Sequence, residues 1–291
     1  MERREIQAMG TTVEMFVDAT AGAAVERAFD DACAEIERLE ALLSRFRSES
    51  ELSRLNRLGR LRAGDDLFAV VALALQARAS SDGRFDPTVH DAMVAAGYDR
   101  TFDDVPAEAP PPPGAAAPGG GEFRIDPDRR EITLGPGVRL DLGGIAKGYV
   151  VDRVAERLAA VGPCLVNAGG DIRIAGPARR DPWPVGVEAP GEPLVIGLHE
   201  GAVATSGRDR RRWRRGGDEQ HHLIDPSIGR PADGDLRTVT VVAEDACRAE
   251  VLAKSLFLRG AREARVEADA LGVPCVLVTD DDRVVLAGGL S

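Results

Sequence analysis

The sequence predicts an α+β fold in which mixed sheets pack with helices. Short strands are predicted at 123–125, 132–134, 164–166, 185–188 and 194–198. Other stretches repeat apolar residues at the spacing of a helix. Apolar residues make up 44% of the 291-residue chain, which is enough for a substantial core. Strands mixed with helices in this way indicate an α+β protein.

The first elements are a strand and two helices. Residues 11–18 alternate enough to predict the strand. An apolar stripe then marks a long amphipathic helix, and we assign this stripe to the core: Val25, Phe29, Ala32, Ile36, Leu39 and Leu43. The second helix is predicted over about 67–80, and Gly83 supplies a natural stop after it.

A segment of strongly biased amino-acid composition follows. Residues 106–121 are almost only Pro, Ala, Gly and Glu, and they include the run Pro110–Pro113. Because such a composition buries little, we predict an exposed, partly extended insertion loop at about 104–121. Near the end of the chain, strands are predicted at 239–242 and 275–278 on either side of a helix over 246–258, and a closing strand at 283–286.

The composition excludes several classes of function. A net charge of −11 argues against a surface built for nucleic acid or anionic lipid. Cys33, Cys164, Cys247 and Cys275 lack the close pairing of a structural zinc site, so we expect buried thiols. The chain has no apolar signal region at its start and no run of about eighteen apolar residues. We therefore expect a cytoplasmic protein without membrane insertion.

The segment Leu140–Tyr149 carries the strongest functional signal. It is interpreted as a strand that ends in a glycine turn, from which a helix begins. Gly143 and Gly144 let backbone N–H groups approach an anion, the helix adds the positive end of its dipole, and Lys147 adds a full charge. This pattern predicts a phosphate site. The alternative is a tight turn with a solvated lysine.

Further motifs accompany this turn. Asn167–Asp171 and Thr205–Gly207 each follow an apolar run and are predicted as turns that end a strand, and His222 precedes Asp225 and Pro226 by a few residues. With Met9–Thr11, Ser50–Asn56 and Phe85–Thr88, these motifs occur in the order found in the FAD:protein FMN transferases. The chain thus resembles the ApbE-like flavin transferases from roughly Ile6 to Leu286, in about eight separate blocks.

The resemblance implies a single domain over 1–291 and a reaction with FAD. A Ser or Thr of a partner protein attacks the phosphorus on the FMN side, and AMP leaves. Such phosphoryl transfer needs positioning, neutralisation of the phosphate oxygens and a base. Two alternatives remain open: an FAD-binding or storage protein without transferase activity, and an FAD pyrophosphatase that yields FMN and AMP.

The resemblance also assigns residues to FAD. Asp141 and Lys147 would contact it, with Lys147 near the diphosphate. The remaining candidates for contact are Met9, Phe46, Arg84, Phe85, Asp86, Thr205, Ser206 and His222. For each, a structural alternative stands beside the functional one: turn capping for Asp141, core packing for Met9 and Phe46, and turn hydrogen bonds for Thr205 and Ser206.

His222 is the candidate general base or substrate positioner, with Asp225 to orient it and His221 as a weaker candidate. Imidazole titrates near physiological pH, although a histidine beside Asp-Pro also suits a turn hydrogen bond. The arginine cluster at 208–215, interleaved with Trp213, predicts a solvated hairpin with its turn at Gly216–Gly217. Alternatively, one of these arginines clamps the phosphate of the leaving AMP.

The family's magnesium site is altered in this chain. The resemblance places a metal between the backbone carbonyl of Gly144 and two residues of the last predicted helix, here Glu250 and Lys254. An ammonium has no lone pair to offer a cation. Three interpretations stay open: a retained Mg²⁺, an ordinary helical ion pair between positions i and i+4, and a Lys254 ammonium that takes the place of the metal.

Overall fold

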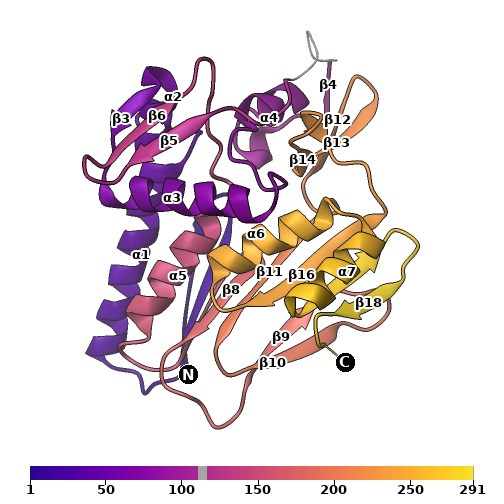
Figure 1. Cartoon of the computed structure of the whole chain (residues 1–291). Coiled ribbons are helices and arrows are strands. Elements are labelled where there is room, and N and C mark those ends of the chain that lie inside the picture. The colour runs from indigo at the N-terminus through magenta and orange to yellow at the C-terminus, as the bar shows by residue number, and fades with distance from the viewer. Residues whose placement is uncertain (111–116, 291) are drawn as a thin grey trace. The chain divides into compact units, whose positions relative to one another are not determined.

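The computed structural model describes residues 1–110 and 117–290 (Figure 1). It divides into two compact units. The first unit comprises Met1–Arg38, Lys147–Gly207 and Gly234–Ser291, and the second comprises Leu39–Ala146 and Arg208–Asp233. The fold is α+β, as the sequence predicts. The single domain that the resemblance implies stays a prediction.

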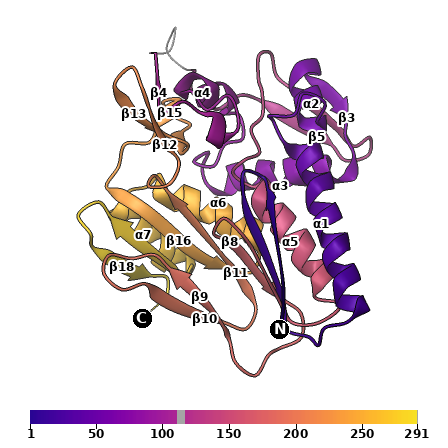
Figure 2. The ribbon, with the colours of Figure 1, turned by 180° about the vertical axis from the view of Figure 1, so that it is seen from behind.

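The first unit is built on an eight-stranded antiparallel sheet with the order β1-β2-β7-β8-β11-β16-β17-β18. Its strands are β1 (Glu2–Ala8), β2 (Thr11–Val17), β7 (Cys164–Ala168), β8 (Asp171–Ala175), β11 (Gly201–Gly207), β16 (Leu236–Ala243), β17 (Cys275–Thr279) and β18 (Val284–Ala287). Helices α6 (Ala246–Phe257) and α7 (Ala261–Leu271) cover one face of the sheet (Figure 1). The hairpin of β9 (Trp183–Val187) and β10 (Leu194–Leu198) covers the other face, as the view from behind shows (Figure 2).

The hairpin cover explains the apolar character of the sheet on both sides. Trp183 and Val185 of β9 pack on Leu165, Ile174 and Val203 of the sheet. Because successive side chains of a strand point to opposite faces, each central strand needs apolar residues in both registers. Residues 164–166 of β7 and 275–278 of β17 are accordingly continuous apolar runs, which is the pattern that predicts these two strands.

The second unit holds α2 (Glu51–Leu58), α3 (Asp65–Ser80), α4 (His90–Ala96) and small sheets. One sheet joins β3 (Arg60–Arg62), β6 (Glu131–Leu134) and β5 (Phe123–Asp126). Another joins β13 (Asp218–His221), β12 (Arg212–Arg215) and β4 (Glu108–Ala109), and a third pairs β14 (Ile224–Asp225) with β15 (Arg230–Pro231). A 3₁₀ turn covers Phe102–Asp104. Helices α1 (Ala23–Leu43) and α5 (Ala146–Leu158) contain residues of both units.

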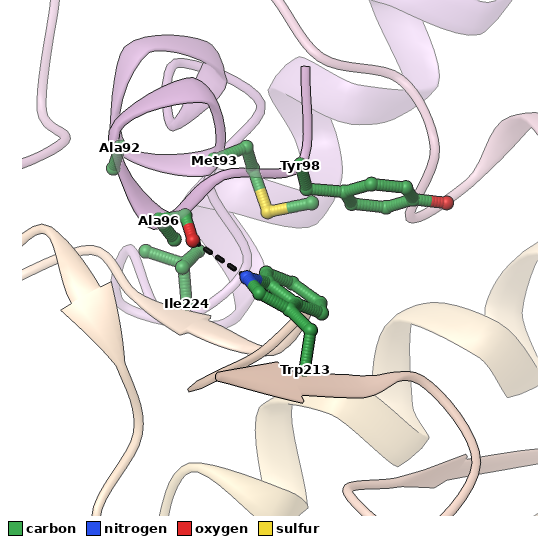
Figure 3. Packing of buried hydrophobic residues seen from close by; sticks show 6 residues of the cluster. All are labelled: Ala92, Met93, Ala96, Tyr98, Trp213 and Ile224. Carbon is green, nitrogen blue, oxygen red and sulfur yellow. Dashed lines mark hydrogen bonds between the residues drawn. The ribbon is translucent and has the colours of Figure 1, made fainter. Parts of the chain in front are cut away.

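A buried cluster in the second unit joins two distant stretches of its sequence (Figure 3). Met93, Ala96 and Tyr98 from α4 and the residues after it pack on Trp213 and Ile224. The indole Nε1–H of Trp213 donates a hydrogen bond to the carbonyl of Ala96 at 2.7 Å. Buried indole groups need such a partner, so this bond fixes the packing of the cluster.

Most of the predicted elements are confirmed. The long helix, the helix over 67–80 and the helix over 246–258 correspond to α1, α3 and α6, and the predicted strands correspond to β2, β5, β6, β7, β9, β10, β16, β17 and β18. The predicted hairpin of arginines is β12 and β13 with its turn at Gly216–Gly217. Cys164, Cys247 and Cys275 are buried thiols, and Cys33 is partly exposed.

Two local predictions are wrong. Leu140–Leu142 is not a strand, because its backbone is bound by a side chain: the Asn56 amide donates to the Leu140 carbonyl and accepts from the Leu140 N–H, both at 2.8 Å. Thr205 and Ser206 do not form a turn after a strand but lie inside β11, paired with β16. Small polar residues are tolerated there because the ladder satisfies their backbone groups.

The predicted insertion loop is bounded by contacts within the second unit. Residues 111–116 of this loop lie outside the described residues. Before them, β4 pairs in parallel with β12. After them, Gly119 donates its N–H to the carbonyl of Pro226 at 2.7 Å.

None of the helices in the described residues combines the length and apolarity needed to cross a membrane.

Candidate functional site

The start of α5 is a glycine turn followed directly by the helix. The carbonyl of Leu142 accepts from the N–H groups of Ile145 and Ala146, at 3.0 and 2.8 Å, and closes the turn that contains Gly143 and Gly144. Lys147 therefore lies in the first turn of α5. The helix and the turn confirm this part of the predicted phosphate motif, and the strand before them is replaced by an irregular segment.

Gly148 allows α5 to pack closely against the start of α6. A Cβ atom at this position would lie 2.7 Å from the backbone carbon and oxygen of Ala246 and from the N of Cys247. Real Cβ atoms do not approach backbone this closely, so only glycine allows this spacing of the two helices. The close approach brings Lys147 of α5 next to Glu250 of α6.

Four side chains of the first unit form what we call the lysine–acid cluster: Lys147, Asp171, Glu250 and Lys254. Lys147 Nζ donates to Glu250 Oε1 at 2.9 Å and also contacts Asp171 Oδ2. Lys254 Nζ donates to the same Glu250 Oε1 at 3.1 Å. The other carboxylate oxygen, Glu250 Oε2, accepts the backbone N–H of Gly148 at 3.0 Å.

The acids of the cluster are buried and the amines are partly exposed. Glu250 and Asp171 expose 2% and 4% of their side chains, whereas Lys147 and Lys254 expose 20% and 19%. Burial by itself would raise the pKa of Glu250, but the ammonium groups of Lys147 and Lys254 outweigh burial and hold this pKa at about 2. Burial raises the pKa of Asp171 above its usual range, against the opposing charge of Lys147. The exposed side of the cluster is thus its cationic side.

The donor set does not fit a magnesium ion. Mg²⁺ needs near-octahedral oxygen ligands at about 2.1 Å. Both oxygens of Glu250 already accept N–H groups, and two ammonium groups occupy its surroundings. In the part of the chain that the structure describes, no three His, Cys, Asp or Glu side chains group together in a way that could hold a metal ion. We therefore assign no chemical step to a metal.

Other candidates of the first unit lie in the sheet and its turns. Met9 adopts a positive φ of 54° in the tight turn between β1 and β2, where Gly10 is also left-handed. Thr205 Oγ1 lies 2.9 Å from Thr240 Oγ1 on the neighbouring strand, and Ser206 is buried on the opposite face. Asp171 follows the turn of the β7–β8 hairpin, where Asn167 Oδ1 accepts the Gly170 N–H at 2.9 Å.

In the second unit, Asp141 is held by a residue that sequence reasoning missed. The Arg45 guanidinium lies 2.8 Å from Asp141 Oδ2, and both side chains are buried. Asp141 Oδ1 accepts the N–H of Gly143 at 2.7 Å, which is the turn-capping role. Arg45 also stacks over the ring of Phe46, at 4.2 Å from its centroid. Phe46 is partly exposed and lies 5.7 Å from the ring of Tyr98.

Asp86 is fully engaged within the second unit. Its Oδ1 accepts from the backbone N–H and the hydroxyl of Thr88, at 2.8 and 2.7 Å, and its Oδ2 accepts from Gly120 N–H at 2.8 Å. Phe85 beside it is buried, and Arg84 lies 3.8 Å from the carboxylate of Asp82. These bonds fix the loop that ends the insertion, so the structure shows a structural role for Asp86.

The histidine pair divides into a buried and a partly buried member. His221 is buried, its Nε2 lies 3.0 Å from the carbonyl of Ala232, and its Nδ1 accepts the Leu223 N–H. Burial lowers the pKa of His221. Because its Nδ1 accepts an N–H group, the ring is a neutral structural group. Asp225 accepts from the N–H and hydroxyl of Ser227, at 2.8 and 2.7 Å. That Asp225 orients His222 stays a prediction.

The fold is similar to those of solved ApbE proteins. The ApbE protein of Thermotoga maritima is 26% identical with a TM-score of 0.86, over 98% of this chain and 96% of that one. The flavinyl transferase ApbE of Pseudomonas stutzeri, in its apo form, is also 26% identical, with a TM-score of 0.82 over 98% and 94%.

Sequence comparison assigns the family. The model of the ApbE family matches residues 9–277. The FAD:protein FMN transferase of Haemophilus influenzae is 30% identical over 95% of this chain and 86% of its own length. That of Treponema pallidum is 30% identical over 92% and 81%. The chain belongs to the ApbE family.

Proposed function

We propose that this protein transfers the FMN moiety of FAD onto a Ser or Thr hydroxyl of a partner protein. The observation that carries the proposal is Lys147, which lies directly after the glycine turn, in the first turn of α5, with its ammonium held by two buried carboxylates. Helix N-termini and fixed ammonium groups both suit phosphate oxygens. Relatives named FAD:protein FMN transferase support this reaction over storage or hydrolysis of FAD.

The reaction balances without a further reactant. A bond forms between the acceptor hydroxyl oxygen and the phosphorus on the FMN side of FAD. The bond from this phosphorus to the bridging oxygen breaks, and its electron pair leaves with AMP. The hydroxyl proton passes to a base, for which His222 is our candidate, with Asp225 as its orienting group.

The remaining candidates have binding roles in this proposal. Lys147 neutralises the diphosphate, and Asp141 fixes the glycine turn through Gly143. Phe46 offers a partly exposed aromatic face for a flavin or adenine ring. The other residues that we assign to FAD are Met9, Arg84, Phe85, Asp86, Thr205 and Ser206. Gly144 and Glu250 are the metal ligands that the resemblance implies, and the donor set around Glu250 argues against that role.

The proposal is tested by incubation with FAD and an acceptor flavoprotein that lacks its flavin. Transfer predicts covalent flavin fluorescence on the acceptor in a denaturing gel and one AMP for each labelled acceptor. Bound FAD without product would indicate storage, and AMP without labelled protein would indicate hydrolysis. Either of these results would refute the transferase proposal.

The base is tested by a matched pair of histidine variants. His222→Asn should lower the rate of transfer at saturating FAD by about 10²–10⁴, the usual contribution of general base catalysis. The control is His199→Asn, because His199 is exposed and has no role in the proposed site. An equal effect of both variants on the rate would exclude His222 as the base.

A further inference from the structure

The chain uses lysine in two positions only. Its 37 basic side chains comprise 35 arginines and two lysines, Lys147 and Lys254. These two residues are 107 positions apart in the sequence, yet both ammonium groups bind the same oxygen of Glu250. Elsewhere in the described residues, apart from the pair of His90 and Asp91, the ion pairs are formed by arginine, including the buried pair of Arg45 and Asp141. Ion pairing alone therefore does not explain why lysine occurs at these two positions.

The geometry of the cluster explains the choice. A guanidinium is a broad planar fork that matches a carboxylate side by side, whereas an ammonium is a compact point charge with three N–H donors. Two ammonium groups can approach one carboxylate oxygen at 2.9 and 3.1 Å and still direct other N–H groups elsewhere. In the described residues, Glu250 is the one ion-pair partner of Lys254, so its ammonium retains donors for a ligand.

We propose that Lys254 binds the diphosphate of FAD beside Lys147 and that its ammonium supplies positive charge where a divalent cation would otherwise do so. The inference rests on the proposed function and deepens it. Glu250 binds both ammonium groups from the buried side, and Asp171 contacts that of Lys147. The side chains of Lys147 and Lys254 stay 20% and 19% exposed, so a ligand in solvent can reach both amines. Fixed charges of this kind stabilise developing negative charge without reorganisation during the reaction.

FAD affinity measured with and without divalent cation tests the inference directly. Flavin fluorescence titrations of the wild-type protein in EDTA and in excess Mg²⁺ should give dissociation constants within about threefold of each other, and the transfer rate should follow the same rule. A loss of affinity or rate of tenfold or more in EDTA would overturn the inference. It would leave the proposed function intact, because transfer would still occur with Mg²⁺.

Substitution of Lys254 should make FAD binding depend on Mg²⁺, unlike that of the wild-type protein. Lys254→Thr should weaken FAD binding in EDTA by tenfold or more, and Mg²⁺ should restore part of this loss. Lys254→Arg keeps the charge but not the compact shape, so it should also bind FAD more weakly in EDTA. Unchanged affinity in both variants, with circular dichroism spectra like that of the wild type, would overturn the inference.

A measurement on the wild-type protein keeps the test valid if the variants do not fold. Because the chain has two lysines, the amines that acetic anhydride can acetylate are those of Lys147 and Lys254 and the α-amino group of Met1, which is exposed and serves as the internal reference. In EDTA, FAD or inorganic pyrophosphate should protect both lysines and leave Met1 unchanged. Labelling of Lys254 that is unaffected by saturating FAD would overturn the inference. A protein that binds no FAD in either buffer would instead refute the proposed function.

Discussion

Replacing Glu250 by glutamine should destabilise the first unit strongly. The carboxylate accepts two ammonium groups on one oxygen and the N–H of Gly148 on the other. An amide has one oxygen, so either orientation directs its NH₂ group at another donor. A pKa held at about 2, instead of the usual 4.5, corresponds to about 3 kcal/mol in favour of the folded state at neutral pH. We therefore expect Glu250→Gln to lower the free energy of unfolding by about 3 kcal/mol, within the range of about 3–5 for a broken buried pair.

Urea unfolding followed by circular dichroism measures this loss, and Glu35→Gln is the matched control. Glu35 is also buried, and its pKa is also about 2. The hydrogen bond from Arg38 lowers this pKa more than burial raises it. Its partners Arg38 and Arg157 are almost half exposed and stay hydrated. Its loss should therefore be smaller, about 1 kcal/mol. A loss for Glu250→Gln no larger than that for Glu35→Gln would refute the reasoning.

The pH dependence gives a second check on Glu250. A carboxyl whose pKa is lowered in the folded protein contributes stability that is present above pH 4.5 and is lost as the pH falls towards 2. The difference in unfolding free energy between wild type and Glu250→Gln should therefore shrink between pH 6 and pH 3. A constant difference across this range would show that the charge of Glu250 is not the cause.

Three further predictions concern other packing contacts. Gly148→Ala places a Cβ 2.7 Å from the backbone of Ala246 and should cost about 1–3 kcal/mol in urea unfolding; an unchanged midpoint would contradict the close approach. Trp213→Phe removes the hydrogen bond to Ala96 and should lower the free energy of unfolding by about 1–2 kcal/mol; an unchanged free energy of unfolding would contradict a stabilising role for this bond. Burial raises the pKa of Asp152 to about 6, so its contribution to stability is full below pH 3.8 and is lost as the pH rises through 6. Asp152→Asn should remove that decline, and an identical pH profile would refute the assignment.

Local sequence patterns predicted the elements whose structure depends on nearby residues alone. The stripe from Val25 to Leu43 is buried along α1, as its helical spacing requires. The hairpin at 212–221 followed from its Gly-Gly turn, where both glycines adopt positive φ. In both cases the information lies within a few residues of sequence, so no distant contact is needed to interpret it.

Contacts between distant residues decide the cases that failed. Leu140 is predicted as part of a strand because it is apolar. In the structure, both of its backbone groups are instead bound by Asn56, which lies 84 positions away in the sequence. Asp141 N–H donates to the carbonyl of Pro87, which also removes it from any strand ladder. No pattern within the segment itself contains these partners. Arg45 escaped notice for the same reason, because its partner Asp141 lies far along the chain.

The interpretation of Glu250 and Lys254 as a helical ion pair is correct in geometry and incomplete in energetics. On an exposed helix, a pair at i and i+4 contributes about 0.3–0.5 kcal/mol, because water screens both charges. Glu250 is buried, so its charge must be compensated by the protein, and Lys254 alone does not satisfy both oxygens. The close approach at Gly148 brings the second ammonium and a backbone N–H to the same carboxylate. The spacing seen in the sequence therefore indicates the pair, and the absence of a side chain at Gly148 converts it into a fixed cationic site.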